Sequence, residues 1–204
     1  DFDGTIYPPN PELWHAVREA EYQTIINHTG RSKEKVITEF EKLHKKIYPS
    51  ATETVAKLSG TSIAAAAVEM EKYFDRRDFV QRDKKLIKLF HQLKNFRHFT
   101  LANGAMARHR ETLAVLGVPV ETFELMITSE VVGVTKPHEA GFRYILDYTK
   151  LPPETHLMIG DREAVDLVPA KKLGMKTCLV WSDTPSPVAD ITLPTVYDLV
   201  KVLT

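Results

Sequence analysis

Acidic residues stand at two distant places in the sequence, with a lysine between them. Asp1 and Asp3 open the chain, Asp161 and Asp166 lie near its far end, and Lys136 is followed by a proline. Hard cations such as Mg²⁺ prefer carboxylate oxygens, and an ammonium group neutralises the oxygens of a phosphate. If folding brings these five residues together, they form a site for a metal ion and a phosphate group.

Short apolar runs precede these polar residues and indicate how the fold brings them together. From Leu86 onward such runs alternate with amphipathic helical segments, which is typical of a parallel sheet wound by helices on both faces. In these sheets, ligands bind beyond the carboxyl ends of the strands. The predicted strands are Phe96–Leu101, Leu125–Thr128, His156–Ile159, Lys176–Trp181 and the edge strand Asp190–Leu193. The predicted helices are Lys84–Lys94, Met106–Leu116, Glu139–Tyr148, Arg162–Leu173 and Val196–Leu203.

The segment from Asn10 to about Arg82 has a different pattern, which predicts several successive helices. Asn10 is a good capping residue before Pro11, and Gly30 ends the first helix. Further helices are expected around residues 36–47, Thr52–Leu58 and Ser62–Phe74. We therefore predict an α/β fold with a doubly wound, Rossmann-like core made of residues 1–9 and 83–204. A small all-helical cap domain, residues 10–82, is inserted into that core.

Composition narrows the possible partners. The 204 residues include 27 basic and 27 acidic side chains, so no net positive charge favours nucleic acid. No apolar run approaches the roughly 18 residues of a membrane helix, and no signal peptide is recognisable. A soluble cytoplasmic protein is expected, with neither a nucleic-acid nor a membrane partner. The segment that begins at Asp1 reads like the end of a buried strand, so we also expect several residues to precede Asp1 in the natural protein.

The polar residues carry a family resemblance. Asp1-Phe2-Asp3-Gly4-Thr5 resembles the first motif of the haloacid dehalogenase-like hydrolases, and Leu101-Ala102-Asn103-Gly104 resembles the second. Lys136-Pro137 is similar to the third motif, and Gly160-Asp161-Arg162 through Asp166 is similar to the fourth. The order and spacing agree over nearly the whole chain, including the helical segment between the first two motifs.

The resemblance implies a phosphatase that hydrolyses a small phosphorylated metabolite with Mg²⁺. Asp1 would be the nucleophile that forms an aspartyl-phosphate, and Asp3 the acid and then the base. Lys136 would neutralise the phosphoryl oxygens. The family pattern places Mg²⁺ on the carboxylate of Asp1 and the backbone carbonyl of Asp3. The same pattern adds Asp161, and Asp166 either directly or through another ligand.

Other candidate residues have local alternatives. Backbone N–H groups near Gly4, Asn103 and Gly104 are expected to bind the remaining phosphate oxygens. Asp161 is also placed to cap a helix that begins at Arg162. Thr5 is as well placed to brace its loop as to touch the substrate.

Ala102 departs from the family pattern, which usually has serine or threonine at this position to bind the phosphoryl group. Losing one such donor costs on the order of 10²–10³ in rate. The departure leaves a non-catalytic protein that binds a ligand or partner as an alternative. A 2-haloacid dehalogenase is a second alternative, although that reaction needs neither a metal nor Asp3. A phosphotransferase or phosphomutase would use the same aspartyl-phosphate and is a third.

Overall fold

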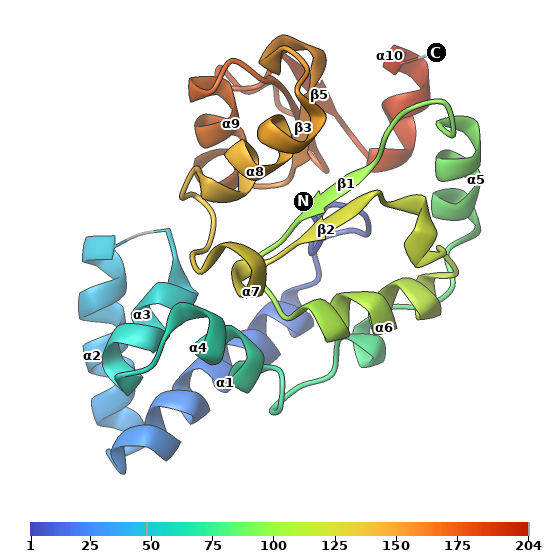
Figure 1. The fold of residues 1–204 in the computed structure, drawn as a ribbon. Coiled ribbons are helices and arrows are strands. Elements are labelled where there is room, and N and C mark those ends of the chain that lie inside the picture. Colours follow the sequence, from blue (N-terminus) through green and yellow to red (C-terminus); the bar gives the residue numbers. More distant parts are fainter. Residues whose placement is uncertain (48, 204) are drawn as a thin grey trace.

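The computed structural model describes residues 1–47 and 49–203; Tyr48 and Thr204, which fall within the ranges predicted for the two domains, lie outside the described residues. Two groups of elements are visible in Figure 1. Helices α1 to α4, coloured blue to teal, gather on one side of the molecule, and the strands with the later helices occupy the other. The α/β fold class predicted from the sequence is confirmed.

Within residues 1–47 and 49–203, the strands are all parallel and fall in two sheets. Strands β1 (Phe99–Leu101) and β2 (Leu125–Ile127) form one pair. The other sheet has the order β3-β4-β5, with bounds Leu157–Gly160, Lys176–Val180 and Ile191–Leu193. Each predicted strand is present. The first begins three residues later than expected, because the N–H of Phe96 donates to Leu93 in the turn that follows α5.

The connecting helices also follow the predicted order, with the addition of a four-residue helix at Ser129–Val132 that was not predicted. They are α5 (Lys84–Gln92), α6 (Met106–Leu116), α7 (Ser129–Val132), α8 (Ala140–Thr149), α9 (Val168–Lys172) and α10 (Val200–Leu203). Short 3₁₀ turns are η1 (Arg76–Phe79), η2 (Val120–Thr122), η3 (Pro153–Thr155) and η5 (Val196–Leu199). Two predicted helices are each divided. Arg162–Leu173 consists of a π-helical turn, η4 (Glu163–Leu167), and the short helix α9, and Val196–Leu203 consists of the 3₁₀ turn η5 and the short helix α10.

The second sheet separates two hydrophobic clusters. In β4, Cys178 and Val180 belong to a cluster with α5 and α6, whereas Leu179 belongs to one with α8 and α9. Successive side chains of a strand point to opposite faces, so this alternation means that helices cover both faces. The core is therefore doubly wound, as predicted.

Helices α1 (Pro11–Thr29), α2 (Lys33–Ile47), α3 (Ala51–Ser59) and α4 (Ile63–Met70) have a hydrophobic cluster of their own. The Asn10 side chain accepts from Glu12 N–H at the start of α1, and Gly30 ends that helix with φ of 65°, both as predicted. Helix α4 ends at Met70, four residues earlier than expected. The chain turns there and directs Glu71 toward the core. We retain the division into a cap, 10–82, and a core, 1–9 with 83–204, as a proposal.

A cavity of about 420 Å³ is lined by apolar side chains from strands of both sheets, which include Phe99, Leu101, Leu157 and Ile159. At its end the backbone nitrogen of Asp1 donates to Ile159 O over 2.9 Å. This bond anchors Asp1 beside the carboxyl end of β3. Among the described residues, no helix has the length and apolar character needed to cross a membrane.

Candidate active site

The predicted site residues meet at the carboxyl ends of the strands. Asn103 follows β1, Lys136 lies downstream of β2, and Asp161 follows β3 directly. Asp1 joins them through its backbone bond to β3. Residues up to 160 positions apart are therefore neighbours because parallel strands end at one edge of the sheet.

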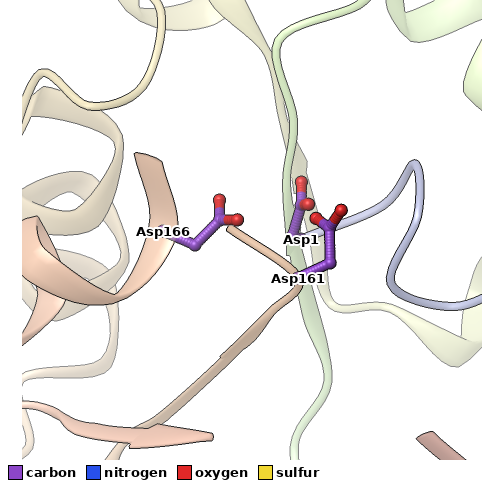
Figure 2. A group of neighbouring side chains, drawn as sticks. All are labelled: Asp1, Asp161 and Asp166. Carbon is purple, nitrogen blue, oxygen red and sulfur yellow. The ribbon is translucent and has the colours of Figure 1, made fainter. Parts of the chain in front are cut away.

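Three carboxylates form the centre of the site. Oxygens of Asp1, Asp161 and Asp166 all lie within 4.8 Å of one another, and Figure 2 shows the three side chains converging from separate segments. Burial, followed by the charge of Asp166, raises the pKa of Asp161 to about 6. Such a group of oxygen donors suits a hard divalent cation.

Lys136 holds two of these carboxylates. Its Nζ donates to Asp1 Oδ1 and, over 2.6 Å, to Asp166 Oδ1, and its side chain is 1% exposed. The opposite oxygen of Asp1, Oδ2, accepts a hydrogen bond of 3.0 Å from Thr5 Oγ1. The Asp1 carboxylate is thus oriented from both sides, and Thr5 braces its own loop.

The π-helical turn η4 positions Asp166. Asp166 Oδ2 accepts from Arg162 N over 3.2 Å, which closes the turn back onto its start. Gly160 makes room, because a Cβ there would lie 2.5 Å from Asp166 Cβ. The alternative role predicted for Asp161, a helix cap, is wrong: Arg162 precedes the first residue of η4, and no side chain caps it. The carboxylate of Asp166 binds the local backbone instead, which leaves Asp161 facing the site.

Asn103 and Lys136 are joined by two hydrogen bonds. Lys136 N donates to Asn103 Oδ1 over 2.7 Å, and Asn103 Nδ2 donates back to Lys136 O over 3.2 Å. The side chain of Asn103 thereby ties the loop after β1 to the loop after β2. This contact fixes the backbone from which Lys136 reaches Asp1.

Two glycines permit close approaches around the site. Gly4 has φ of 71°, and a Cβ there would lie 2.7 Å from Asp161 Oδ2. At Gly104 a Cβ would lie 2.9 Å from both Glu71 Oε1 and His109 Nε2. Side chains at either position would push the site residues apart, which accounts for glycine in both motifs.

Asp3 is bound by Arg76, which was not predicted from the sequence, and by Tyr7. Arg76 Nε lies 2.9 Å from Asp3 Oδ1, Arg76 Nη2 lies 3.0 Å from Oδ2, and Tyr7 Oη also donates to Oδ1. Arg76 Nη1 donates to Glu71, so one buried guanidinium serves two carboxylates. Burial alone would raise the pKa of Asp3, but Arg76 and its hydrogen bonds hold it well below the usual range. The side chain of Asp3 therefore stands apart from the cluster of Asp1, Asp161 and Asp166.

A cavity of about 390 Å³ opens over the site between the strand ends and helices α1 to α4. On the side of the strand ends, the cavity is lined by Asp1, Asp161 and Asn103. On the opposite side it is lined by Arg18 and Glu21 of α1 and Thr52 of α3. This volume is within the range of small-molecule sites, about 300–1,000 Å³. The arrangement can therefore bring a small molecule against the Asp1 carboxylate.

Comparison with known proteins agrees with this geometry. A family model described as haloacid dehalogenase-like hydrolase matches residues 1–174. A segment of 77 residues is 39% identical to glyceraldehyde 3-phosphate phosphatase from Methanocaldococcus jannaschii, covering 38% of this chain and 33% of that protein. The chain thus matches about a third of the length of that relative.

Solved structures share the fold over nearly the whole chain. A HAD phosphatase from Thermococcus onnurineus superposes with a TM-score of 0.68 at 22% identity, covering 98% of this chain and 94% of that one. An L-2-haloacid dehalogenase from Xanthobacter autotrophicus gives a TM-score of 0.57 at 15% identity, covering 92% of each chain.

Proposed function

Because the chain belongs to the haloacid dehalogenase-like hydrolases, we propose that it hydrolyses a small phosphomonoester through an aspartyl-phosphate on Asp1. The observation that carries this proposal is the setting of Asp1. Lys136 and Thr5 orient its two oxygens, and two further carboxylates adjoin it. The phosphatase named for the Methanocaldococcus jannaschii relative supports the same reaction.

The three clustered carboxylates fit a magnesium ion. Mg²⁺ is bound by oxygen ligands, and one oxygen from each of Asp1, Asp161 and Asp166 lies within 4.8 Å of the others. We propose that these three, with the backbone carbonyl of Asp3, hold the ion. Bound there, Mg²⁺ would reduce the repulsion between Asp1 and the negatively charged phosphate.

The residues of the chain supply the covalent chemistry. An oxygen of Asp1 attacks phosphorus, the bond from phosphorus to the ester oxygen breaks, and the alcohol leaves. Lys136 stabilises the charge on the phosphoryl oxygens, and the backbone near Gly4 and Gly104 offers further donors. Water then splits the acyl-phosphate, restoring Asp1 and releasing phosphate.

Asp3 is proposed to give a proton to the leaving alcohol and then to take one from the attacking water. Its contact with Arg76 favours the ionised carboxylate, the form required of a base. Acting as an acid requires the contact to loosen as substrate enters. Retention of Asp3 favours phosphate chemistry over dehalogenation, which does not need this carboxyl group.

The decisive assay compares the wild-type protein with Asp1→Asn. Phosphate release from an aryl phosphate and a panel of phosphorylated metabolites is measured with Mg²⁺ and with EDTA. We expect metal-dependent release in the wild type and at least about 10³-fold less in Asp1→Asn. The matched control is Asp147→Asn on the exposed face of α8, which should keep full activity. Undiminished release by Asp1→Asn, or halide release from 2-haloacids in EDTA, would reject the mechanism.

A further inference from the structure

The residue directly after β4 has an unusual backbone conformation. Trp181 has φ of 60°, in the left-handed region that a bulky aromatic residue rarely adopts. Among the described residues other than glycine, only Lys150 also has a positive φ, and it ends helix α8, where this conformation is common. Trp181 follows a strand, so a helix end does not explain its conformation. Strained residues of this kind persist where surrounding contacts hold them, and they cluster at functional sites.

The indole of Trp181 binds the loop that carries Asp1. Its Nε1 donates to Thr5 O over 2.9 Å, across 176 positions of sequence. Thr5 is buried, and its Oγ1 donates to Asp1 Oδ2 over 3.0 Å. The indole therefore holds the backbone of the same residue whose hydroxyl orients the proposed nucleophile.

The indole ring is itself anchored in the core. The rings of Trp181 and Tyr197 meet edge to face, with their centres 5.6 Å apart and an angle of 88° between their planes. Tyr197 Oη donates to Asp83, and Asp83 caps α5 by accepting from Lys85 N over 2.8 Å. Trp181 thus connects the loop of Asp1 to the start of a core helix.

The position of Trp181 indicates an indirect role. It is not among the described residues that line the active-site cavity, so it can influence a bound substrate only through its neighbours. Thr5 is the neighbour that reaches the site, because its hydroxyl also lies 3.5 Å from Asp161 Oδ1.

We propose that Trp181 is a positioning residue for the nucleophile: its indole N–H fixes the Thr5 carbonyl and thereby keeps the Thr5 hydroxyl against Asp1. This inference rests on the proposed function and adds the end of β4 to the site. Residues that orient a reactive or metal-binding side chain typically contribute about 10- to 100-fold to activity or metal affinity. Trp181 acts one residue further away, so its effect should lie at the lower end of this range.

The test variant is Trp181→Phe, which keeps an aromatic ring beside Tyr197 and removes the indole N–H. With an aryl phosphate and Mg²⁺, we expect kcat to fall about tenfold. KM should change by less than about twofold, because the residues that line the cavity are unaltered. The matched control is Ser182→Ala at the next residue, whose hydroxyl donates to Thr184 O over 3.0 Å within its own turn. Its kcat should match that of the wild type.

A double-variant cycle tests whether Trp181 acts through Thr5. Thr5→Val removes the hydroxyl that orients Asp1 and retains the carbonyl that accepts from the indole. In the Thr5→Val background, Trp181→Phe should lower kcat by less than about twofold, because the contact that it supports is already absent. A tenfold loss in both backgrounds would overturn the inference, since Trp181 would then contribute only to the structure.

An unchanged kcat in Trp181→Phe, or a loss through KM alone, would overturn the inference as well. If the wild type hydrolyses no ester, the proposed function fails separately. The affinity for Mg²⁺, measured by calorimetry, then decides the inference. Trp181→Phe should weaken this affinity about threefold by loosening the Asp1 carboxylate, and equal affinities would reject the inference.

Discussion

The Arg76 guanidinium donates hydrogen bonds to both carboxylate oxygens of Asp3, over 2.9 Å from Nε to Oδ1 and 3.0 Å from Nη2 to Oδ2. The two residues are 73 positions apart in the sequence. Glu71 binds the same guanidinium, and the side chains of Arg76 and Glu71 are 6% and 5% exposed. One arginine therefore compensates two largely buried negative charges.

Replacing this arginine should cost more stability than a surface change. Arg76→Met leaves Asp3 and Glu71 without a cation, and we expect the free energy of unfolding to fall by about 3–5 kcal/mol. Adding Glu71→Gln removes one of the stranded charges, so the double variant should be more stable than Arg76→Met. Urea denaturation measures both effects.

The neighbouring Arg77 provides the control, because its side chain is 47% exposed and pairs with Asp75 at the surface. Arg77→Met should change the free energy of unfolding by less than about 1 kcal/mol. Equal losses for the two arginines would contradict the interpretation of a buried network.

Replacing Lys136 should have opposite effects on the affinity for Mg²⁺ and on the rate of phosphate release. Lys136→Met removes the positive charge that contacts Asp1 and Asp166, so the remaining carboxylates should bind Mg²⁺ about tenfold more tightly. Phosphate release should nonetheless fall by about 10²–10³-fold, because the phosphoryl oxygens lose a donor. Calorimetry with Mg²⁺ and a phosphate-release assay give the two values.

Lys84→Met at the exposed start of α5 is the matched control and should alter neither value. Weaker Mg²⁺ binding in Lys136→Met would mean that the lysine supports the metal site rather than competing with it.

Substituting Ala102, the alanine of the second motif, should increase activity. Ala102 is buried directly after β1, and a serine hydroxyl there would add one donor for the phosphoryl group. We expect Ala102→Ser to raise kcat about tenfold, a part of the rate that such a donor contributes in other enzymes. Steady-state kinetics with an aryl phosphate measure the change.

Ala105→Ser is the control, since Ala105 precedes α6 and makes no side-chain capping bond. A serine there should stabilise the helix by about 1 kcal/mol and leave kcat unchanged. If both variants raise kcat equally, rigidity of the loop and not a new phosphate contact is the cause.

Glu21 should make stability depend on pH. Burial raises the pKa of Glu21 to about 7, above its value in the unfolded chain. As pH rises through the window from about 4.5 to 7, the unfolded chain loses this proton first, so the folded state loses stability. Glu21→Gln has no such proton and should therefore become more stable relative to the wild type at pH 8 than at pH 4.5, by on the order of 3 kcal/mol.

Thermal or urea unfolding of both proteins across that range measures the difference. Glu19 lies on the same helix and its side chain pairs with Lys33 in solvent, so Glu19→Gln should track the wild type at each pH. A stability difference between Glu21→Gln and the wild type that is constant with pH would contradict the raised pKa.

The sequence predicted those features that depend on local signals or on sheet topology. Asn10 and Gly30 bound a helix because capping and left-handed residues act within one turn. Asp1, Lys136 and Asp161 meet because polar residues that follow parallel strands share one edge of the sheet.

The residues that the sequence did not predict lie on or beside helices α1 to α4. Arg76, Glu71 and Glu21 have the charged residue types expected of solvated helix faces, and only tertiary packing buries them beside the site. Their spacing carries no sign of this burial. The end of α4 shows the same limit, because the helix stops at Met70 and Glu71 binds Arg76 five residues later.

Because of the π-helical turn Glu163–Leu167, the position of the Asp166 carboxylate depends on the number of residues between Gly160 and Asp166. A polypeptide with one residue fewer between Gly160 and Asp166 could continue as an ordinary α-helix into α9. Asp166 would then turn by about 100° around the helix axis, away from Lys136. A one-residue deletion here should thus be as damaging as loss of the carboxylate, and natural variation in this turn should preserve its residue count even where it changes the side chains.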